Sequence, residues 1–213
     1  MRSDGVDRLS CILVSEMTDL TPAQAAAAKP EAGKRERLTN AAVQLLHERG
    51  IERTTLADIA ALAGVPPGNV YYYFKSKDDV VAAVIDAHAA QIRATLASIE
   101  TRHRSPKSRL KAFVRELAAR SETVAEHGCP LGSLCWELDK RVTPSSFTVG
   151  ELMRLPIEWA EAQFKSMGRR DARDLALDLI AAYEGSALLA NTMGDPNLLA
   201  GAARRIGNWI DAL

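Results

Sequence analysis

The sequence predicts an all-α protein: an N-terminal three-helix domain that contains a helix-turn-helix, followed by a larger helical domain. Apolar residues recur at three- and four-residue steps from position 34 onward, and Gly or Pro separates the periodic stretches. No alternating apolar and polar pattern bounded by turn residues indicates a strand. We expect a disordered tail over residues 1–33, the helix-turn-helix domain over 34–80 and the larger domain over 81–213.

Composition and charge exclude several classes of protein. With 47% hydrophobic and 25% charged residues and no apolar run near the roughly 20 needed to span a bilayer, the chain resembles a soluble globular protein. The apolar stretch Leu9–Val14 is too short for an export signal, so we expect a cytoplasmic protein, and its cysteines (Cys11, Cys129 and Cys135) to be reduced. Basic and acidic residues number 27 each, but basic residues outnumber acidic ones seven to four over 34–77, which favours an anionic partner there.

Two helices are expected before the corner of the helix-turn-helix. A single apolar stripe predicts the first helix from Lys34 to Gly50. Thr55 stands three residues before Asp58, so its hydroxyl is placed to cap a second, short helix whose buried face begins at Leu56.

The corner itself is predicted at Gly64, which permits a positive φ. Pro66 suits the first turn of a third helix that we expect to run to Tyr73. In a helix-turn-helix the second helix of the pair lies in the major groove of DNA, but helix pairs with a glycine corner also occur in many other proteins. The residues on the third helix therefore decide between the two interpretations.

Those residues favour DNA. Pro67 and Gly68 are small enough for close approach to base edges, and the Asn69 side chain offers both a donor and an acceptor. Three consecutive tyrosines place phenols on more than one side of the helix, where a phenol can reach a phosphate, although Tyr73 is equally suited to cap the core. The candidate DNA-binding residues are Lys34, Arg35, Thr55, Pro67, Gly68, Asn69, Tyr71, Tyr72, Tyr73 and Lys77.

The larger domain is expected to be helical throughout. Ser76 is placed to cap a long fourth helix, and Pro156 must kink or divide a later one. The further helices are expected over 106–128, 133–140, 147–167, 171–192 and 196–213.

Three segments, Thr54–Ala60, Ala63–Val65 and Gly68–Lys77, resemble the DNA-binding domain of the TetR family of transcriptional repressors, and the resemblance covers 34–84. It implies that Pro67, Gly68 and Asn69 face bases, that Thr55, Tyr71 and Lys77 face phosphates, and that Tyr72 faces either. Since Pro67 and Gly68 present almost no polar atoms, direct readout is expected to depend on Asn69, Tyr72 and the arm over 34–37.

The resemblance also implies a homodimer on an inverted-repeat operator of double-stranded DNA, with recognition helices roughly 34 to 36 Å apart. Apolar stripes on the last two helices are candidates for the dimer interface, although such stripes can also pack inside one chain. The candidate interface residues are Leu175, Leu179, Ala182, Ser186, Leu189, Ile206, Trp209 and Ile210.

The resemblance further implies a small-molecule effector bound within the larger domain. Few charged residues fall on the expected inner faces, which favours a largely apolar effector, and aromatic and Met side chains commonly wall such cavities. The candidate ligand-binding residues are Phe113, Leu117, Leu134, Trp136, Met153, Trp159 and Tyr183. No cofactor or metal is expected, because His127, Cys129 and Cys135 lack the spacing of a metal motif.

Other functions remain open. The segment Gly128–Cys135 resembles one found in a subset of the family, and Cys129 or Cys135 is a candidate sensor of oxidants or electrophiles, since a thiolate is favoured near a helix start. The alternative is that both are small buried thiols. A protein-binding adaptor, an activator and an enzyme are further alternatives, but no nucleophile elbow, phosphate loop or catalytic carboxylate pair supports the enzyme.

Overall fold

The all-α prediction is confirmed. The structure is a computed structural model that describes residues 33–139 and 149–213, and within these ranges it contains helices and no strand. The predicted tail lies outside the described residues except for Gly33, and so does Phe147. The chain forms two compact units, one that ends at Val84 and one that begins at Ile85, so the boundary lies inside a helix.

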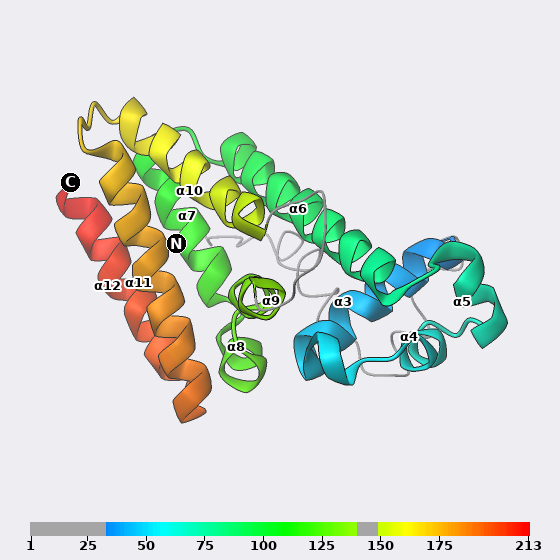
Figure 1. The fold of residues 1–213 in the computed structure, drawn as a ribbon. Coiled ribbons are helices and arrows are strands. Elements are labelled where there is room, and N and C mark those ends of the chain that lie inside the picture. The colour runs from blue at the N-terminus through cyan, green and yellow to red at the C-terminus, as the bar shows by residue number, and fades with distance from the viewer. Residues whose placement is uncertain (1–32, 140–148) are drawn as a thin grey trace, which may run out of the picture. The chain divides into compact units, whose positions relative to one another are not determined.

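The first unit contains α3 (Lys34–Arg53), α4 (Leu56–Leu62), α5 (Pro67–Tyr73) and the start of α6 (Lys77–Arg102), as Figure 1 shows. Gly50 ends the regular helix that begins at Lys34, as predicted: its φ of 79° and ψ of 169° are not helical, and after this kink a short helical stretch runs to Arg53. Thr54 stabilises this bend because its buried hydroxyl donates to the carbonyl of Gly50 at 2.8 Å. The core of the unit is formed by Leu38, Ala42, Leu45, Ile59, Ala60, Val70 and Phe74.

In the described residues of the second unit, the rest of α6 is followed by six more helices. These are α7 (Pro106–Ala118), α8 (Ser121–His127), α9 (Pro130–Asp139), α10 (Val149–Ser166), α11 (Ala172–Met193) and α12 (Pro196–Ala212). The helix expected over 106–128 is thus divided at positions 119–120, and α9 begins three residues before the predicted start. Pro156 lies inside α10 without dividing it.

The core of this unit lies between α7, α10, α11 and α12, and α11 packs along α12 (Figure 1). Leu110, Phe164, Leu179 and Ile210 are completely buried in it. A second, smaller cluster joins α8 and the residue before α9 to α11 through Val124, Cys129 and Tyr183.

Among the described helices, α6 is the one with the length and composition of a membrane span, with a mean hydropathy of 1.3 over 18 residues. Its apolar residues are used inside the protein: Val81, Val84, Ile85, Leu96 and Ile99 are buried. The burial of this stripe is what a core helix requires.

Candidate nucleic-acid interface

The corner between α4 and α5 has the predicted geometry. At the start of α4, the Asp58 amide donates to Thr55 Oγ1 at 3.2 Å and the Thr55 amide donates to Asp58 Oδ2 at 2.9 Å, a complete capping box. The Asp58 carboxylate also accepts from the Thr55 hydroxyl at 2.6 Å, and the hydrogen bonds that it accepts from this hydroxyl and from the Thr55 amide lower the pKa of Asp58. Gly64 has φ +61°, and buried Val65 donates its amide to the carbonyl of Ala60 at 3.0 Å. The corner therefore fixes where α5 begins.

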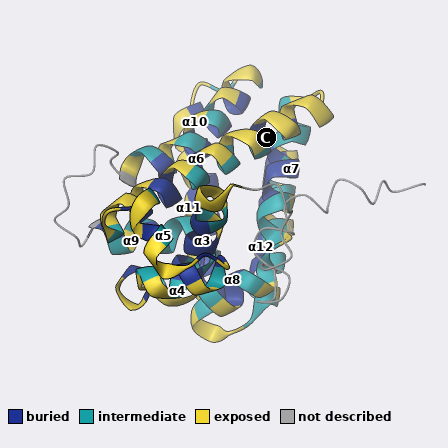
Figure 2. Cartoon of the chain, turned by 90° about the vertical axis from the view of Figure 1, so that its right-hand side faces the viewer, coloured by how far each residue is buried: buried dark blue, intermediate teal, exposed yellow. Residues whose placement is uncertain are grey.

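The orientation of α5 follows from its two anchors. Val70 and Phe74 are each 1% exposed, so one side of the helix is held in the core. The opposite side is open: Tyr71 is 58% and Tyr72 77% exposed, and Figure 2 shows much of α5 in the colour of exposed residues. Pro67 and Gly68 are exposed at the start of α5, and Asn69 is half-buried. The small residues, the amide and two phenols therefore lie on the N-terminal and outer parts of the helix.

The remaining candidates lie beside α5 in the same unit. Exposed Lys34 begins α3, and one residue later the Arg35 guanidinium lies 5.4 Å from the centre of the Phe74 ring. The Tyr73 ring is half-buried and meets the exposed ring of Tyr72 edge to face at 5.0 Å.

Two lysines are tied to backbone carbonyls. Lys77, the expected phosphate contact, donates from Nζ to the carbonyl of Glu52 at 3.1 Å and so joins the start of α6 to the end of α3. Lys75, which the sequence did not single out, donates to the carbonyl of Tyr71 at 2.7 Å. Its charge therefore lies at the C-terminal end of α5, where a cation interacts favourably with the helix dipole.

The predicted cap of α6 is confirmed. The Asp79 amide donates to Ser76 Oγ at 3.1 Å, and Asp79 Oδ2 accepts from the amides of Lys75 and Ser76 at 2.8 and 3.0 Å. This reciprocal cap fixes the direction in which α6 leaves the three-helix unit.

Four of the seven predicted ligand-binding residues come together. Phe113 and Trp159 pack with ring centres 5.4 Å apart, and half-buried Leu117 and Met153 contact the same cluster. Buried Tyr183 belongs to the smaller cluster, which Leu117 also contacts, and Leu134 is buried as well. Trp136 differs from the prediction: it is 67% exposed, because it lies on the outer side of α9 and not on the side of Leu134.

The environment of the cysteines is unlike that of a reactive thiolate. Cys129 Sγ donates to Glu184 Oε1 at 3.3 Å, and burial together with this carboxyl raises the pKa of Cys129 to about 12. The same two causes raise the pKa of Cys135 to about 11. The expectation that Cys135 lies at a helix start is wrong, since α9 begins five residues earlier at Pro130. Because the thiolate is the reactive form of cysteine, these raised pKa values do not favour the sensor hypothesis.

Glu184 was missed because nothing in the sequence marks a single acid on α11 as half-buried. Burial raises its pKa. Gly132 makes room for it, because a Cβ at that position would come within 2.6 Å of Glu184 Oε2. Among the described residues, no group of three or more His, Cys, Asp or Glu side chains is arranged to hold a metal ion.

The predicted dimer stripe divides between core and surface. Four of the predicted interface residues are buried inside their own chain and belong to its core, so they are not available on the surface for a partner. They are Leu175, Leu179, Ile206 and Ile210. The helical period identified the stripe correctly, but α11 is apolar around most of its circumference, and period alone does not show where the core ends.

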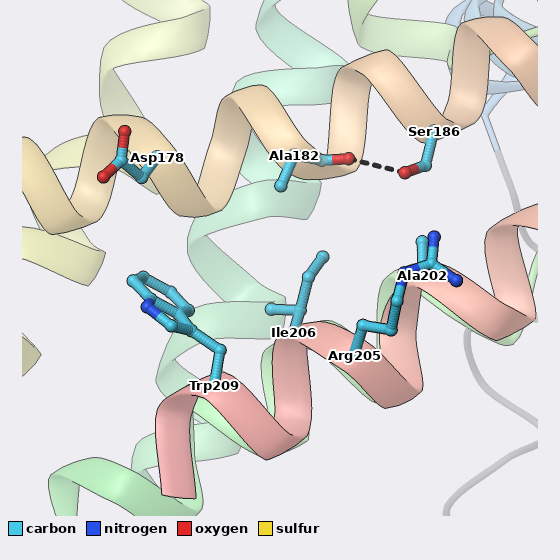
Figure 3. A pocket seen from close by; sticks show the side chains of 7 residues that line it. All are labelled: Asp178, Ala182, Ser186, Ala202, Arg205, Ile206 and Trp209. Carbon is cyan, nitrogen blue, oxygen red and sulfur yellow. Dashed lines mark hydrogen bonds between the residues drawn. The ribbon is translucent and has the colours of Figure 1, made fainter. Parts of the chain in front are cut away.

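The part of the stripe that reaches the surface lines a groove of about 300 Å³ between α11 and α12 (Figure 3). Its walls are formed by Asp178, Ala182, Ser186, Ala202, Arg205, Ile206 and Trp209. Predicted Leu189 is 56% exposed, and Leu177, Leu188 and Met193, which the sequence did not single out, are exposed on the same helix.

Comparisons with known proteins agree with this geometry. The family model of bacterial regulatory proteins, tetR family, matches residues 38–84. The HTH-type transcriptional repressor DhaR of Mycobacterium sp. strain GP1 is 32% identical over 166 residues, which cover 72% of this chain and 80% of DhaR. The regulator TtgR of Pseudomonas putida is 45% identical over 53 residues, a quarter (25%) of each chain. A TetR transcriptional regulator from Legionella pneumophila has a TM-score of 0.74 at 25% identity, covering 84% of this chain and 98% of that one.

Proposed function

Because this chain belongs to the TetR family of transcriptional regulators, we propose that α5 is the recognition helix of a homodimeric repressor and enters the major groove of duplex DNA. The chain is a regulator and not an enzyme. One observation carries the proposal: Val70 and Phe74 are buried, but Tyr71 and Tyr72 next to them are exposed. Two large apolar rings exposed on one helix favour a partner that covers them.

The contacts divide into those that read bases and those that hold phosphates. Pro67 and Gly68 let the start of α5 approach base edges, and Asn69 reads one of them with its amide. Tyr71 and Thr55 bind phosphates, because they lie on the outer side of α5 and at the N-terminus of α4. Lys34 and Arg35 contribute from the first turn of α3, and Lys77 contributes charge from the start of α6.

We assign the homodimer interface to α11 and α12. The groove over Ala182, Ser186 and Trp209 is flanked by exposed Leu189 and Met193, and large exposed apolar patches mark interfaces in soluble proteins. A two-fold symmetric homodimer carries two copies of α5, so its operator is an inverted repeat.

The effector is a small, largely apolar molecule that binds against Phe113, Leu117, Met153 and Trp159. These side chains come from α7 and α10 and form one apolar cluster. Binding there releases the repressor from its operator, and the protein acts where the DNA is, in the cytoplasm. The name of DhaR, a transcriptional repressor, supports repression over activation.

The test is selection of DNA from a random-sequence pool by the full-length protein, followed by a gel shift with the selected duplex. We expect an inverted repeat that is bound in a sequence-dependent way, with an affinity that falls steeply as salt rises because counterions are released. A pool that yields no enriched sequence would refute the proposal. A helical adaptor that binds only protein would give that result.

A further inference from the structure

The last turn of α6 is held by side chains from two other helices of the second unit. Arg109 of α7 donates from Nε to the carbonyl of His103 at 2.9 Å, just beyond the end of α6. Trp159 of α10 donates from Nε1 to Glu100 Oε1 at 2.9 Å. Arg109 and Trp159 therefore fix the same turn from two sides.

A buried glutamine links these two contacts. Gln163, one turn after Trp159 on α10, is 4% exposed; it donates to Glu100 Oε1 at 3.5 Å and accepts from Arg109 Nη1 at 3.4 Å. The arginine also suits its position electrostatically, because a cation near the carbonyl end of a helix is favoured by the helix dipole. The four side chains form one connected network around the end of α6.

Trp159 takes part in two kinds of contact at once. Its ring packs against Phe113 in the apolar cluster, with ring centres 5.4 Å apart, while its N–H group is bonded to Glu100. A molecule that binds beside Phe113 and rotates this ring also carries the indole N–H away from the Glu100 carboxylate. Packed aromatic side chains have few alternative positions, so a displacement of the Trp159 ring also affects its hydrogen bond to Glu100.

The helix at the other end of this contact belongs to both units. α6 begins in the unit that carries α5, at Lys77, and ends in the second unit, at Arg102. The last turn of α6, which these side chains hold, is therefore part of a helix that continues into the DNA-binding unit.

We propose that the Trp159–Glu100 hydrogen bond is the latch by which the apolar cluster controls α6: closed, it favours DNA binding, and displacement of the Trp159 ring opens it. This inference rests on the proposed function, since it assigns regulation to the same apolar cluster. Trp159 is then a positioning residue that acts through α6.

The test uses substitutions that open the latch without an effector. Trp159→Phe keeps an aromatic ring but removes the N–H donor, and Glu100→Ala removes the acceptor. Glu100→Gln is the conservative rescue, because its amide oxygen still accepts from Trp159 and Gln163. Arg173→Ala is the matched control, because it breaks the 3.1 Å ion pair that joins α11 to Glu161 on α10 and leaves the hydrogen bonds of the Glu100 network intact.

Two measurements are made on each full-length variant, well below its melting temperature. We expect Trp159→Phe and Glu100→Ala each to speed hydrogen exchange of the amides over 99–103 and to weaken binding to the selected DNA about five-fold or more, the lower end of allosteric coupling. The double variant should lose no more than either single one, and Glu100→Gln and Arg173→Ala should behave as the parent.

The latch would be overturned if the losses of DNA affinity in the two single variants added up in the double variant. It would also be overturned if hydrogen exchange became faster while DNA affinity stayed unchanged, since a purely structural hydrogen bond affects exchange alone. Unchanged exchange in both single variants would overturn it as well. Failure of the proposed function looks different: the parent itself then selects no DNA, which removes the regulatory role whatever the exchange rates show.

Discussion

Two glycines of the first unit, Gly64 and Gly68, should respond in opposite ways to the same substitution. Gly64 has φ +61° with no atom within 4 Å of an added Cβ, so Gly64→Ala is a purely conformational change. A Cβ in the left-handed region costs roughly 1–2 kcal/mol, and the lower entropy of the unfolded alanine chain offsets about 0.4–1 kcal/mol of that. The net loss of stability is about 1 kcal/mol.

Gly68, by contrast, lies inside α5 without a positive φ and with open space around it. Gly68→Ala should therefore stabilise the helix by about 0.5–1 kcal/mol. The same methyl group lies where α5 approaches the bases, so DNA affinity should fall about ten-fold despite the gain in stability.

Amide hydrogen exchange over α4 and α5 is the appropriate assay, because all three tryptophans lie in the other unit and their fluorescence reports on that unit. We expect exchange over α4 and α5 to speed up about five-fold in Gly64→Ala. Gly64→Asn is the control and should lie between parent and alanine, since asparagine tolerates the left-handed region. An alanine variant as protected as the parent, or an asparagine variant no better than alanine, would refute the conformational account of the corner.

Three further predictions concern DNA contacts, titration and assembly. Tyr71→Phe should weaken binding to all DNA sequences alike and Asn69→Ala should relax discrimination at one base pair, as measured by gel shifts on single-base operator variants; parental affinities in both would contradict the assigned contacts. Burial raises the pKa of Glu184, so the folded protein loses stability as pH rises through that pKa from the ordinary value of 4.5. Glu184→Gln should therefore melt at a higher temperature than the parent at pH 7.5, with a difference that shrinks toward pH 4.5; a difference independent of pH counts against the titration. Leu189→Asp should raise the dimer dissociation constant at least about ten-fold in sedimentation measurements and leave the helical content unchanged, and an unaltered dimer would exclude this face.

The sequence was most informative where one residue type has one structural use. Thr55 and Ser76 cap helices because their hydroxyls stand three residues before an aspartate, and Gly64 turns the corner because its φ is positive. The side chains on α5 could be sorted in the same way, since the spacing of Val70 and Phe74 leaves Tyr71 and Tyr72 outside.

Features that depend on packing between distant helices could not be predicted. Leu175 and Ala182 share a stripe, yet one is in the core and the other lines a groove, and only the position of α12 separates them. The network around Glu100 joins residues up to 63 positions apart, as between Glu100 and Gln163. The helical pattern of apolar residues does not predict which distant residues come into contact. The raised pKa of Glu184 likewise depends on burial between α9 and α11.

Guanine methylation interference on the selected duplex tests the central claim most directly, because guanine N7 lies in the major groove. The account predicts interference in two symmetric half-sites on one face of the duplex, with centres one helical turn or a multiple apart, and predicts that Asn69→Ala changes the base preference within each half-site. Protection of a single site, or interference confined to adenine N3 in the minor groove, would contradict the placement of α5.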